Sequence, residues 1–132
     1  MLLNITTGFN GVPRRPREEI VIFVSSLSKL QAMDIPFLFT DRHANLATAQ
    51  FLSDIPKLNW IDWSALQHRD FKRDLEDPGK FERYQAEALV HRHLPIAGVL
   101  GIICVNDSVA NTLKNSVTRG ADMLKIVSRP GL

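Results

Sequence analysis

Short apolar runs, separated by polar segments, recur along this chain and predict its strands. The runs cover residues 20–24, 36–40, 99–105 and 123–127. Runs of this length that are rich in β-branched and aromatic residues are typical of strands buried on both faces. Apolar residues at helical spacing predict short helices over residues 26–33, 43–53 and 106–118. Because these helices are short and some links are irregular, we predict a mixed α+β domain with small antiparallel sheets rather than a doubly wound parallel sheet.

Polar residues stand where the predicted helices begin. Ser26 can cap the first helix, Asp41 is the expected N-cap of the second, and Asn106 or Asp107 that of the third. His43 falls at the entrance of the second helix, where free backbone N–H groups and the helix dipole favour an anionic ligand. A plain capping or packing role for His43 is equally compatible with the sequence.

The stretch from Arg83 to His93 combines an alternating pattern with a high density of reactive side chains. In an extended chain, alternate residues point to the same side. One side would then hold Gln85, Glu87, His91 and His93, which supply an amide, a carboxylate and two imidazoles. We therefore expect this stretch to be the chemical centre of the chain.

Three interpretations of this face stay open on the residues alone. Glu87, His91 and His93 could bind zinc or non-haem iron, although a His-x-His pair without a placed third ligand is a weak signal. The polar side could simply face water, as it does in many antiparallel strands. Alternatively, Glu87 could stabilise the oxocarbenium ion that forms when a glycosidic bond breaks, while Gln85 presents its amide to the acceptor.

Residues 55–79 form a long polar link in front of this stretch. We expect it to be irregular and to turn at residues 77–79, which read Asp-Pro-Gly. Such a loop could contact a substrate, or its mixed charges could neutralise one another at the surface. Trp60 and Trp63 are expected to be core anchors rather than base-stacking platforms.

The opening of the chain is basic. Glycines and prolines surround Arg14, Arg15 and Arg17, so residues 1–19 are expected to form an irregular, exposed loop. Its arginines could bind phosphate, or they could pair with Glu18 and Glu19.

Composition limits the function without identifying it. The chain has 132 residues, 45% of them hydrophobic and 23% charged, which is ordinary for one globular domain. A net charge of +2 is too small by itself to predict nucleic-acid binding. Cys104 is the single cysteine, so no internal disulfide is expected and a cytoplasmic setting is the default. No apolar run approaches the roughly 20 residues of a membrane-spanning helix, so we expect neither secretion nor membrane insertion. The sequence contains no P-loop and no Gly-x-Gly-x-x-Gly motif.

Several separated blocks together resemble one protein family. They are residues 39–44 (Phe-Thr-Asp-Arg-His-Ala), 70–71 (Asp-Phe) and 83–90 (Arg-Tyr-Gln-Ala-Glu-Ala-Leu-Val), with the opening blocks 1–5 and 14–16 and the closing block 129–131. In this order, and over nearly the whole chain, they resemble the DarT family of DNA ADP-ribosyltransferases, toxins of bacterial toxin–antitoxin systems. The resemblance implies an α+β, ADP-ribosyltransferase-like fold with two small, mostly antiparallel sheets and short helices around an NAD cleft.

The resemblance also implies a reaction, the transfer of ADP-ribose from NAD to a base, with thymine the expected acceptor, in single-stranded DNA. Glu87 corresponds to the catalytic glutamate, and Gln85 lies in the loop-to-strand element that selects the acceptor. The candidates for holding the DNA strand, through phosphate charge and base stacking, are Arg15, His43, Arg83 and Tyr84. NAD is then a substrate, and no metal is expected.

Members of the family carry, upstream of the Met-Leu block, a segment whose histidine and arginine bind NAD. The sequence begins at that block, so we expect one ADP-ribosyltransferase-like domain over residues 1–132, shortened at its N-terminus, and we assign no cofactor-binding residue. The expected partners are single-stranded DNA and the cognate macrodomain antitoxin, DarG, with no membrane and a cytoplasmic location. A catalytically inactive nucleic-acid-binding remnant of the family stays open as the alternative.

Overall fold

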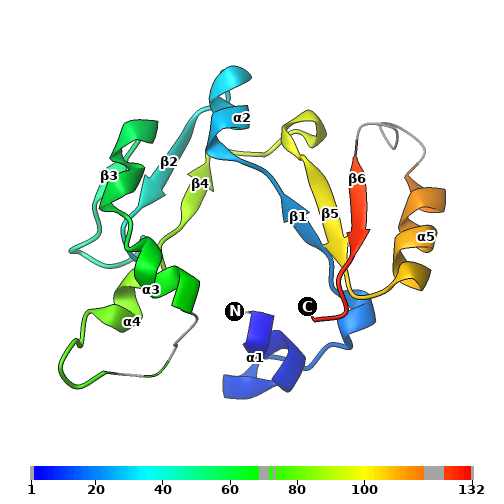
Figure 1. Ribbon diagram of the computed structural model, residues 1–132, viewed down its shortest axis with the longest axis horizontal. Helices are drawn as coiled ribbons and strands as arrows, with labels where there is room; N and C mark the ends of the chain where they lie inside the picture. The colour runs from blue at the N-terminus through cyan, green and yellow to red at the C-terminus, as the bar shows by residue number, and fades with distance from the viewer. Residues whose placement is uncertain (1, 69–71, 73, 118–123, 132) are drawn as a thin grey trace. The chain divides into compact units, whose positions relative to one another are not determined.

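Two compact units make up the chain, each containing one three-stranded sheet (Figure 1). The computed structural model describes residues 2–68, 72, 74–117 and 124–131. One unit consists of Met1–Ser26 and Pro95–Leu132, and we call it the split unit. The other consists of Leu27–Leu94, and we call it the inserted unit because its sequence lies between the two segments of the first. The expectation of a single domain over residues 1–132 stays a prediction.

The sheet of the split unit has the strand order β1-β5-β6, with β5 in the middle (Figure 1). β1 (Ile22–Val24) pairs antiparallel with β5 (Gly101–Cys104), and β5 pairs parallel with β6 (Lys125–Ser128). Parallel neighbours need a crossover connection, and the link between β5 and β6 contains the helix α5 (Asp107–Ser116). The apolar run at residues 99–105 therefore becomes the central strand.

The core of the split unit forms around that strand. Val99, Ile102 and Leu124 are buried together, and Leu113 of α5 packs against them. Asn106 caps α5, because its side-chain oxygen accepts a hydrogen bond of 2.9 Å from the backbone N–H of Val109. The predicted third helix and its cap are confirmed.

Short helices complete the split unit: α1 (Leu2–Thr7), η1 (Phe9–Gly11), η2 (Arg17–Glu19) and η4 (Ile96–Gly98). The prediction of an irregular loop with little helical structure over residues 1–19 was wrong, because α1, η1 and η2 all lie there. The helix α1 ends at Gly8, whose φ of 74° is the left-handed conformation that glycine adopts without strain. The Gly8 N–H donates to the Asn4 carbonyl at 2.9 Å, which closes the last turn.

The inserted unit has an antiparallel sheet of order β3-β2-β4 (Figure 1). The central strand β2 (Phe37–Thr40) is flanked by β3 (Phe51–Leu52) and β4 (Ala88–Val90). The short helices of this unit are α2 (Leu27–Ala32), η3 (Ile55–Trp60), α3 (Trp63–His68) and α4 (Lys80–Arg83). β2 ends in the two most deeply buried residues of its sheet, Phe39 at 2% exposure and Thr40 at 0%. The α+β prediction is confirmed, with β5–β6 as the parallel exception.

The predicted helix over residues 43–53 was wrong. Residues 44–49 form turns instead, with hydrogen bonds from the N–H of Leu46 to the His43 carbonyl and from the N–H of Ala49 to the Leu46 carbonyl. Asp41 is not a helix cap, because its carboxylate accepts a hydrogen bond of 2.9 Å from the N–H of Gln50. That bond closes residues 41–50 into a loop, from which the chain enters β3.

The extended conformation expected for residues 83–93 was also wrong. Arg83, the first residue of this stretch, is the last residue of α4. The N–H of Gln85 donates to the Glu82 carbonyl at 3.0 Å, so the chain continues in a turn. Only Ala88–Val90 is a strand, and Arg92 has a φ of 63° just beyond it. The alternation that would have placed an amide, a carboxylate and two imidazoles on one side therefore does not exist.

Trp60 and Trp63 are not core anchors, since they are 56% and 48% exposed. The Trp63 indole N–H donates to the Leu58 carbonyl at 2.8 Å, so its polar edge is satisfied locally. Residues 55–79 were expected to be irregular, yet they contain η3 and α3. The predicted turn before α4 is present, and the N–H of Lys80 donates to the Asp77 carbonyl at 3.1 Å. Within the described ranges, no helix is both long and apolar enough to cross a membrane.

Replacing Gly101 by alanine is expected to destabilise the split unit. An added Cβ would lie 2.4 Å from the carbonyl oxygen of Lys125 in β6, so the parallel strand pair would have to move apart. We expect a loss of about 1–3 kcal/mol in the free energy of unfolding, measured by urea denaturation. Gly131→Ala is the control, since an added Cβ there meets nothing within 4 Å. Equal stability of the two variants would contradict the close approach of β5 and β6.

Candidate active site

The carboxylate of Glu87 is held at the end of the central strand of the inserted unit. The backbone N–H of Thr40 donates to the Glu87 carbonyl at 2.9 Å, and the N–H of Glu87 donates to the Thr40 hydroxyl at 3.2 Å. One side-chain oxygen of Glu87, Oε1, accepts a hydrogen bond of 3.0 Å from the N–H of Ala44. The side chain is still 36% exposed, so the carboxylate is both fixed in position and accessible.

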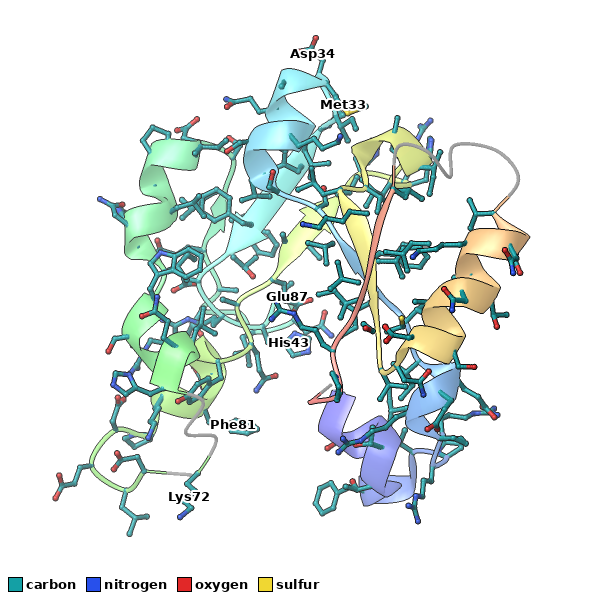
Figure 2. The ribbon with its side chains drawn as sticks, turned by 45° about the vertical axis from the view of Figure 1, so that its right-hand side comes forward. Met33, Asp34, His43, Lys72, Phe81 and Glu87 are labelled. Carbon is teal, nitrogen blue, oxygen red and sulfur yellow. The ribbon has the colours of Figure 1, made fainter. Side chains whose placement is uncertain are left out.

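His43 lies beside this carboxylate (Figure 2). Its Nδ1 is 3.1 Å from the same Glu87 oxygen, and it also accepts a hydrogen bond of 3.2 Å from the N–H of Asn45. A neutral ring can accept the Asn45 N–H at Nδ1, whereas a ring protonated at Nδ1 can donate to Glu87. The position of the ring proton therefore decides which of these two neighbours the Nδ1 of His43 binds.

The Thr40 side chain connects Glu87 with Arg42, the residue before His43. Its hydroxyl donates to the Arg42 carbonyl at 2.6 Å while it accepts the N–H of Glu87. The side chain is completely buried, so water does not replace either bond. A single hydroxyl thus fixes both the backbone of Glu87 and the start of the loop that carries His43.

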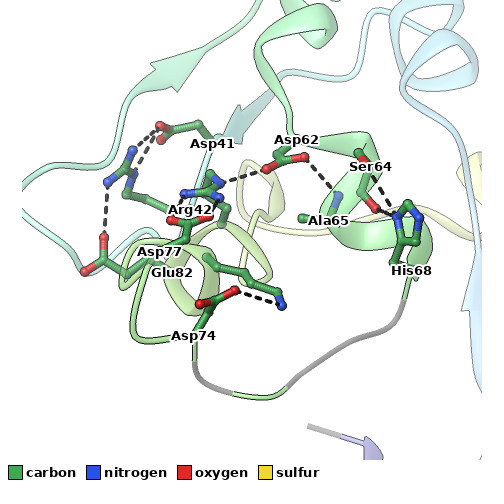
Figure 3. Close-up of polar contacts among 11 residues, drawn as sticks. Asp41, Arg42, Asp62, Ser64, Ala65, His68, Asp74, Asp77 and Glu82 are labelled. Carbon is green, nitrogen blue, oxygen red and sulfur yellow. Dashed lines mark hydrogen bonds and ion pairs between the residues drawn. The ribbon is translucent and has the colours of Figure 1, made fainter.

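The loop over residues 41–50 is also tied to α4 (Figure 3). Arg42 contacts Asp41 at 3.0 Å and, through Nη1, Glu82 at 3.1 Å. Burial raises the pKa of the Asp41 carboxyl, but the hydrogen bonds from Gln50 and Arg42 outweigh it and leave the pKa below the ordinary value. The hydrogen bond to Asp41 is the main cause of a raised pKa for Arg42. The loop is therefore held at its two ends and against a neighbouring helix.

Arg83 forms a second ion-pair network with two aspartates. Its Nε donates to Asp62 at 2.8 Å, and its two terminal nitrogens donate to the carboxylate of Asp77. Asp62 also accepts the N–H of Ala65 at 2.9 Å, as Figure 3 shows. That hydrogen bond and then Arg83 lower the pKa of Asp62, while Arg83 is the main cause of the lowered pKa of Asp77. Arg83 thus joins the beginning of α3, the turn before α4 and α4 itself.

The structure brings Glu87 and His43 into contact, whereas the other candidate residues have other surroundings. Gln85 donates its amide N–H to the Phe81 carbonyl at 3.1 Å, and Tyr84 is half-buried at the end of α4. His91 and His93 are exposed beyond β4, and among the described residues no three His, Cys, Asp or Glu side chains are grouped as metal ligands. Arg15 belongs to the split unit, and the block at residues 70–71 lies outside the described residues.

Sequence reasoning missed the residues that hold the site in place. Thr40 is a threonine that closes an apolar run, which is a common arrangement, and only its complete burial distinguishes it. Asp62 and Asp77 had no signal either, because their shared partner lies 21 and 6 residues away along the chain. The backbone N–H of Ala44 carries no side-chain signature at all.

The family assignment follows from comparison with known proteins. The sequence model of the family described as "ssDNA thymidine ADP-ribosyltransferase, DarT" matches residues 1–132. The chain belongs to the DarT family. The resemblance in the residue blocks is thereby confirmed.

DarT-family relatives are longer than this chain. A DNA ADP-ribosyl transferase from Escherichia coli O127:H6 (strain E2348/69 / EPEC) is 46% identical over 131 residues, covering 99% of this chain and 60% of the relative. One from Thermus sp. (strain 2.9) is 31% identical over 113 residues, covering 86% of this chain and 48% of the relative. The chain therefore spans 60% or less of the length of these relatives.

The fold matches solved DarT structures. The chain is similar to Thermus sp. 2.9 DarT in complex with ADP-ribosylated ssDNA, with a TM-score of 0.85 and 26% identity, covering 98% of this chain and 61% of the other. It is also similar to the same DarT in complex with NAD+, with a TM-score of 0.84, covering 98% of this chain and 65% of the other. The predicted ADP-ribosyltransferase-like fold is confirmed.

Removing the Thr40 hydroxyl is expected to destabilise the inserted unit. Thr40→Val keeps the shape of the side chain but leaves the N–H of Glu87 and the carbonyl of Arg42 without their partner. Buried polar groups that lose their partner cost about 1–3 kcal/mol, which should appear as a lower free energy of unfolding in urea. Thr48→Val, at an exposed position of the same unit, should change stability by much less. If the two variants lose the same stability, the hydroxyl does not hold these segments.

The Arg83 network is expected to make stability fall in acid. The folded state lowers the pKa of Asp62 and Asp77 below the ordinary 3.8, so their ion pairs contribute stability above that pH. That contribution is lost as the pH falls through the lowered folded-state values. Arg83→Met should therefore flatten the acid dependence of the unfolding free energy below about pH 4, whereas the exposed Arg92→Met should leave it unchanged. An unaltered profile for Arg83→Met would refute the assignment.

Proposed function

We propose that this chain carries the catalytic glutamate and the acceptor-binding part of an enzyme that transfers ADP-ribose from NAD to thymine in single-stranded DNA. Membership of the DarT family supports the reaction. The observation that supports Glu87 as the catalytic residue is its half-exposed carboxylate, oriented by the N–H of Ala44 and adjacent to His43. NAD is a substrate in this proposal, and no metal takes part.

In this reaction, the bond between the ribose C1′ and the nicotinamide nitrogen breaks. Its electron pair stays with nicotinamide, which neutralises the pyridinium ring, while positive charge develops on C1′ and the ribose ring oxygen. Glu87 would anchor the ribose and stabilise this charge, because a fixed carboxylate favours a positive transition state more than the ground state. A base nitrogen then bonds to C1′, and Glu87 would accept the proton that the nitrogen loses.

His43, which contacts Glu87, and residues 84–85, which precede it in the chain, supply the acceptor-binding part of the proposal. His43 would contact the substrate while its ring is oriented by Asn45 and Glu87. Tyr84 and Gln85 would contact the base, from the segment between α4 and β4. Because Asp62 and Asp77 already accept the hydrogen bonds of Arg83, its ion pairs favour a role in holding this segment over a direct contact with phosphate. Arg15 would bind the DNA strand from the split unit.

The partners follow from the same family membership. We infer that the chain acts on single-stranded DNA, as the name of its family states, and that the modification is countered by a cognate macrodomain antitoxin, DarG. A cytoplasmic location, where DNA and NAD are both available, completes the proposal. The residues that bind the remainder of NAD are not assigned on this chain.

Glu87→Gln is expected to slow DNA modification strongly without unfolding the protein. The amide keeps the size of the side chain and can still accept the Ala44 N–H, but it removes the negative charge. We expect the rate to fall by about 10²–10³-fold, measured by mass spectrometry as the gain of ADP-ribose on a thymine-containing single-stranded oligonucleotide with NAD. Glu76→Gln, at an exposed carboxylate of the same unit, is the control and should retain full activity.

Two outcomes would contradict the proposal. Full activity of Glu87→Gln would remove Glu87 from the chemistry. If the wild-type protein binds the oligonucleotide but the oligonucleotide gains no mass in the presence of NAD, the result would instead favour the inactive nucleic-acid-binding remnant.

A further inference from the structure

A basic hollow of about 420 Å³ lies at the N-terminal end of the split unit. It is lined by Thr6 and Thr7 of α1 and by residues 14–18, which include three arginines and one glutamate. All of these residues belong to one segment of the split unit, so the hollow is formed without any contribution from the inserted unit. None of its lining residues takes part in the Glu87 site described above.

The backbone holds the two walls of this hollow together. Gly8 and Gly11 have φ values of 74° and 78°, so the chain turns back immediately after α1. The N–H of Arg15 then donates to the Ile5 carbonyl at 2.9 Å, which fixes the basic loop against the helix. Gly8 approaches this loop closely, since an added Cβ would lie 3.3 Å from the Cβ of Arg14. The hollow is therefore organised before any ligand binds.

The charges of the hollow are only partly neutralised. Arg15 lies 3.6 Å from Glu19, and both side chains are more than half exposed, so this pair is weak. Within the described ranges, no carboxylate forms an ion pair with Arg14 or Arg17. Arg42 and Arg83 of the inserted unit, in contrast, each bind two carboxylates. Unneutralised arginines in a preformed hollow are an arrangement that suits an anionic ligand.

We propose that this basic hollow binds a phosphate group of the substrate through Arg14 and Arg17, with Arg15 beside them. Planar guanidinium groups match phosphate oxygens in pairs, which a single exposed ammonium does not. The inference rests on the proposed function only for the source of the phosphate. That source is either the phosphodiester backbone of single-stranded DNA or the pyrophosphate of NAD.

The test compares two double variants that lose the same charge in the same unit. Arg14→Gln/Arg17→Gln removes the arginines of the hollow, whereas Lys114→Gln/Lys125→Gln removes two exposed lysines elsewhere. Binding of a fluorescein-labelled single-stranded oligonucleotide is measured by anisotropy at several salt concentrations, and binding of NAD by calorimetry. Each lost phosphate contact should reduce the slope of log K against log salt by about 0.7.

The two binding measurements distinguish between the two sources of the phosphate. A weaker oligonucleotide affinity and a smaller salt slope for the arginine variant alone would assign the hollow to the DNA backbone. A weaker NAD affinity for that variant alone would assign it to the pyrophosphate. If neither ligand distinguishes the arginine variant from the lysine variant, the proposal is overturned. This outcome is independent of the proposed reaction, which is tested by the dependence of DNA modification on Glu87.

Discussion

The buried hydroxyl of Thr40 is the interaction on which the geometry of the candidate site depends. It donates to the Arg42 carbonyl and accepts the N–H of Glu87, and its complete burial excludes water as a substitute. The loop with His43 and the strand preceded by Glu87 therefore share one fixed point. A reactive side chain is held in an exact position only when the residues around it are also fixed. Here the Thr40 side chain fixes both segments of the site.

Ion pairs connect the segments at the ends of the strands to the neighbouring helices. Arg42 joins the His43 loop to α4, and Arg83 joins α4 to α3 and to the preceding turn. Both networks are only partly buried, so their individual energies are modest and depend on salt and pH. Their value lies in geometry, because each planar guanidinium fixes the direction of two carboxylates at once.

The strands were predictable because their signal is local. Continuous apolar runs at residues 36–40 and 99–105 became the central strands of the two sheets. The helix predicted for residues 43–53 failed because Asp41 binds the N–H of Gln50 and closes a loop, a contact that residue spacing does not reveal. The stretch from Arg83 failed for a similar reason, since partners 21 and 6 residues upstream stabilise the end of α4.

The candidate site shows the same limit. The resemblance of separated sequence blocks selected Glu87 as the catalytic residue, whereas alternation alone had grouped it with Gln85, His91 and His93. The structure instead joins Glu87 to a histidine 44 positions earlier, through a loop rather than along a strand. Thr40 could not be singled out, because its role appears only when both of its hydrogen-bond partners are in place.

The connectivity of the two units has a consequence for synthesis. The inserted unit is continuous in sequence, so all of its strands are available once residue 94 has left the ribosome. The sheet of the split unit pairs Ile22 with Ile103 and then Ile102 with Ile126, so it cannot be completed until residue 126 has been made. Pairing of such distant segments requires the closure of a long loop and is intrinsically slow. The nascent chain can therefore assemble the surroundings of Glu87 before the sheet of the split unit is complete.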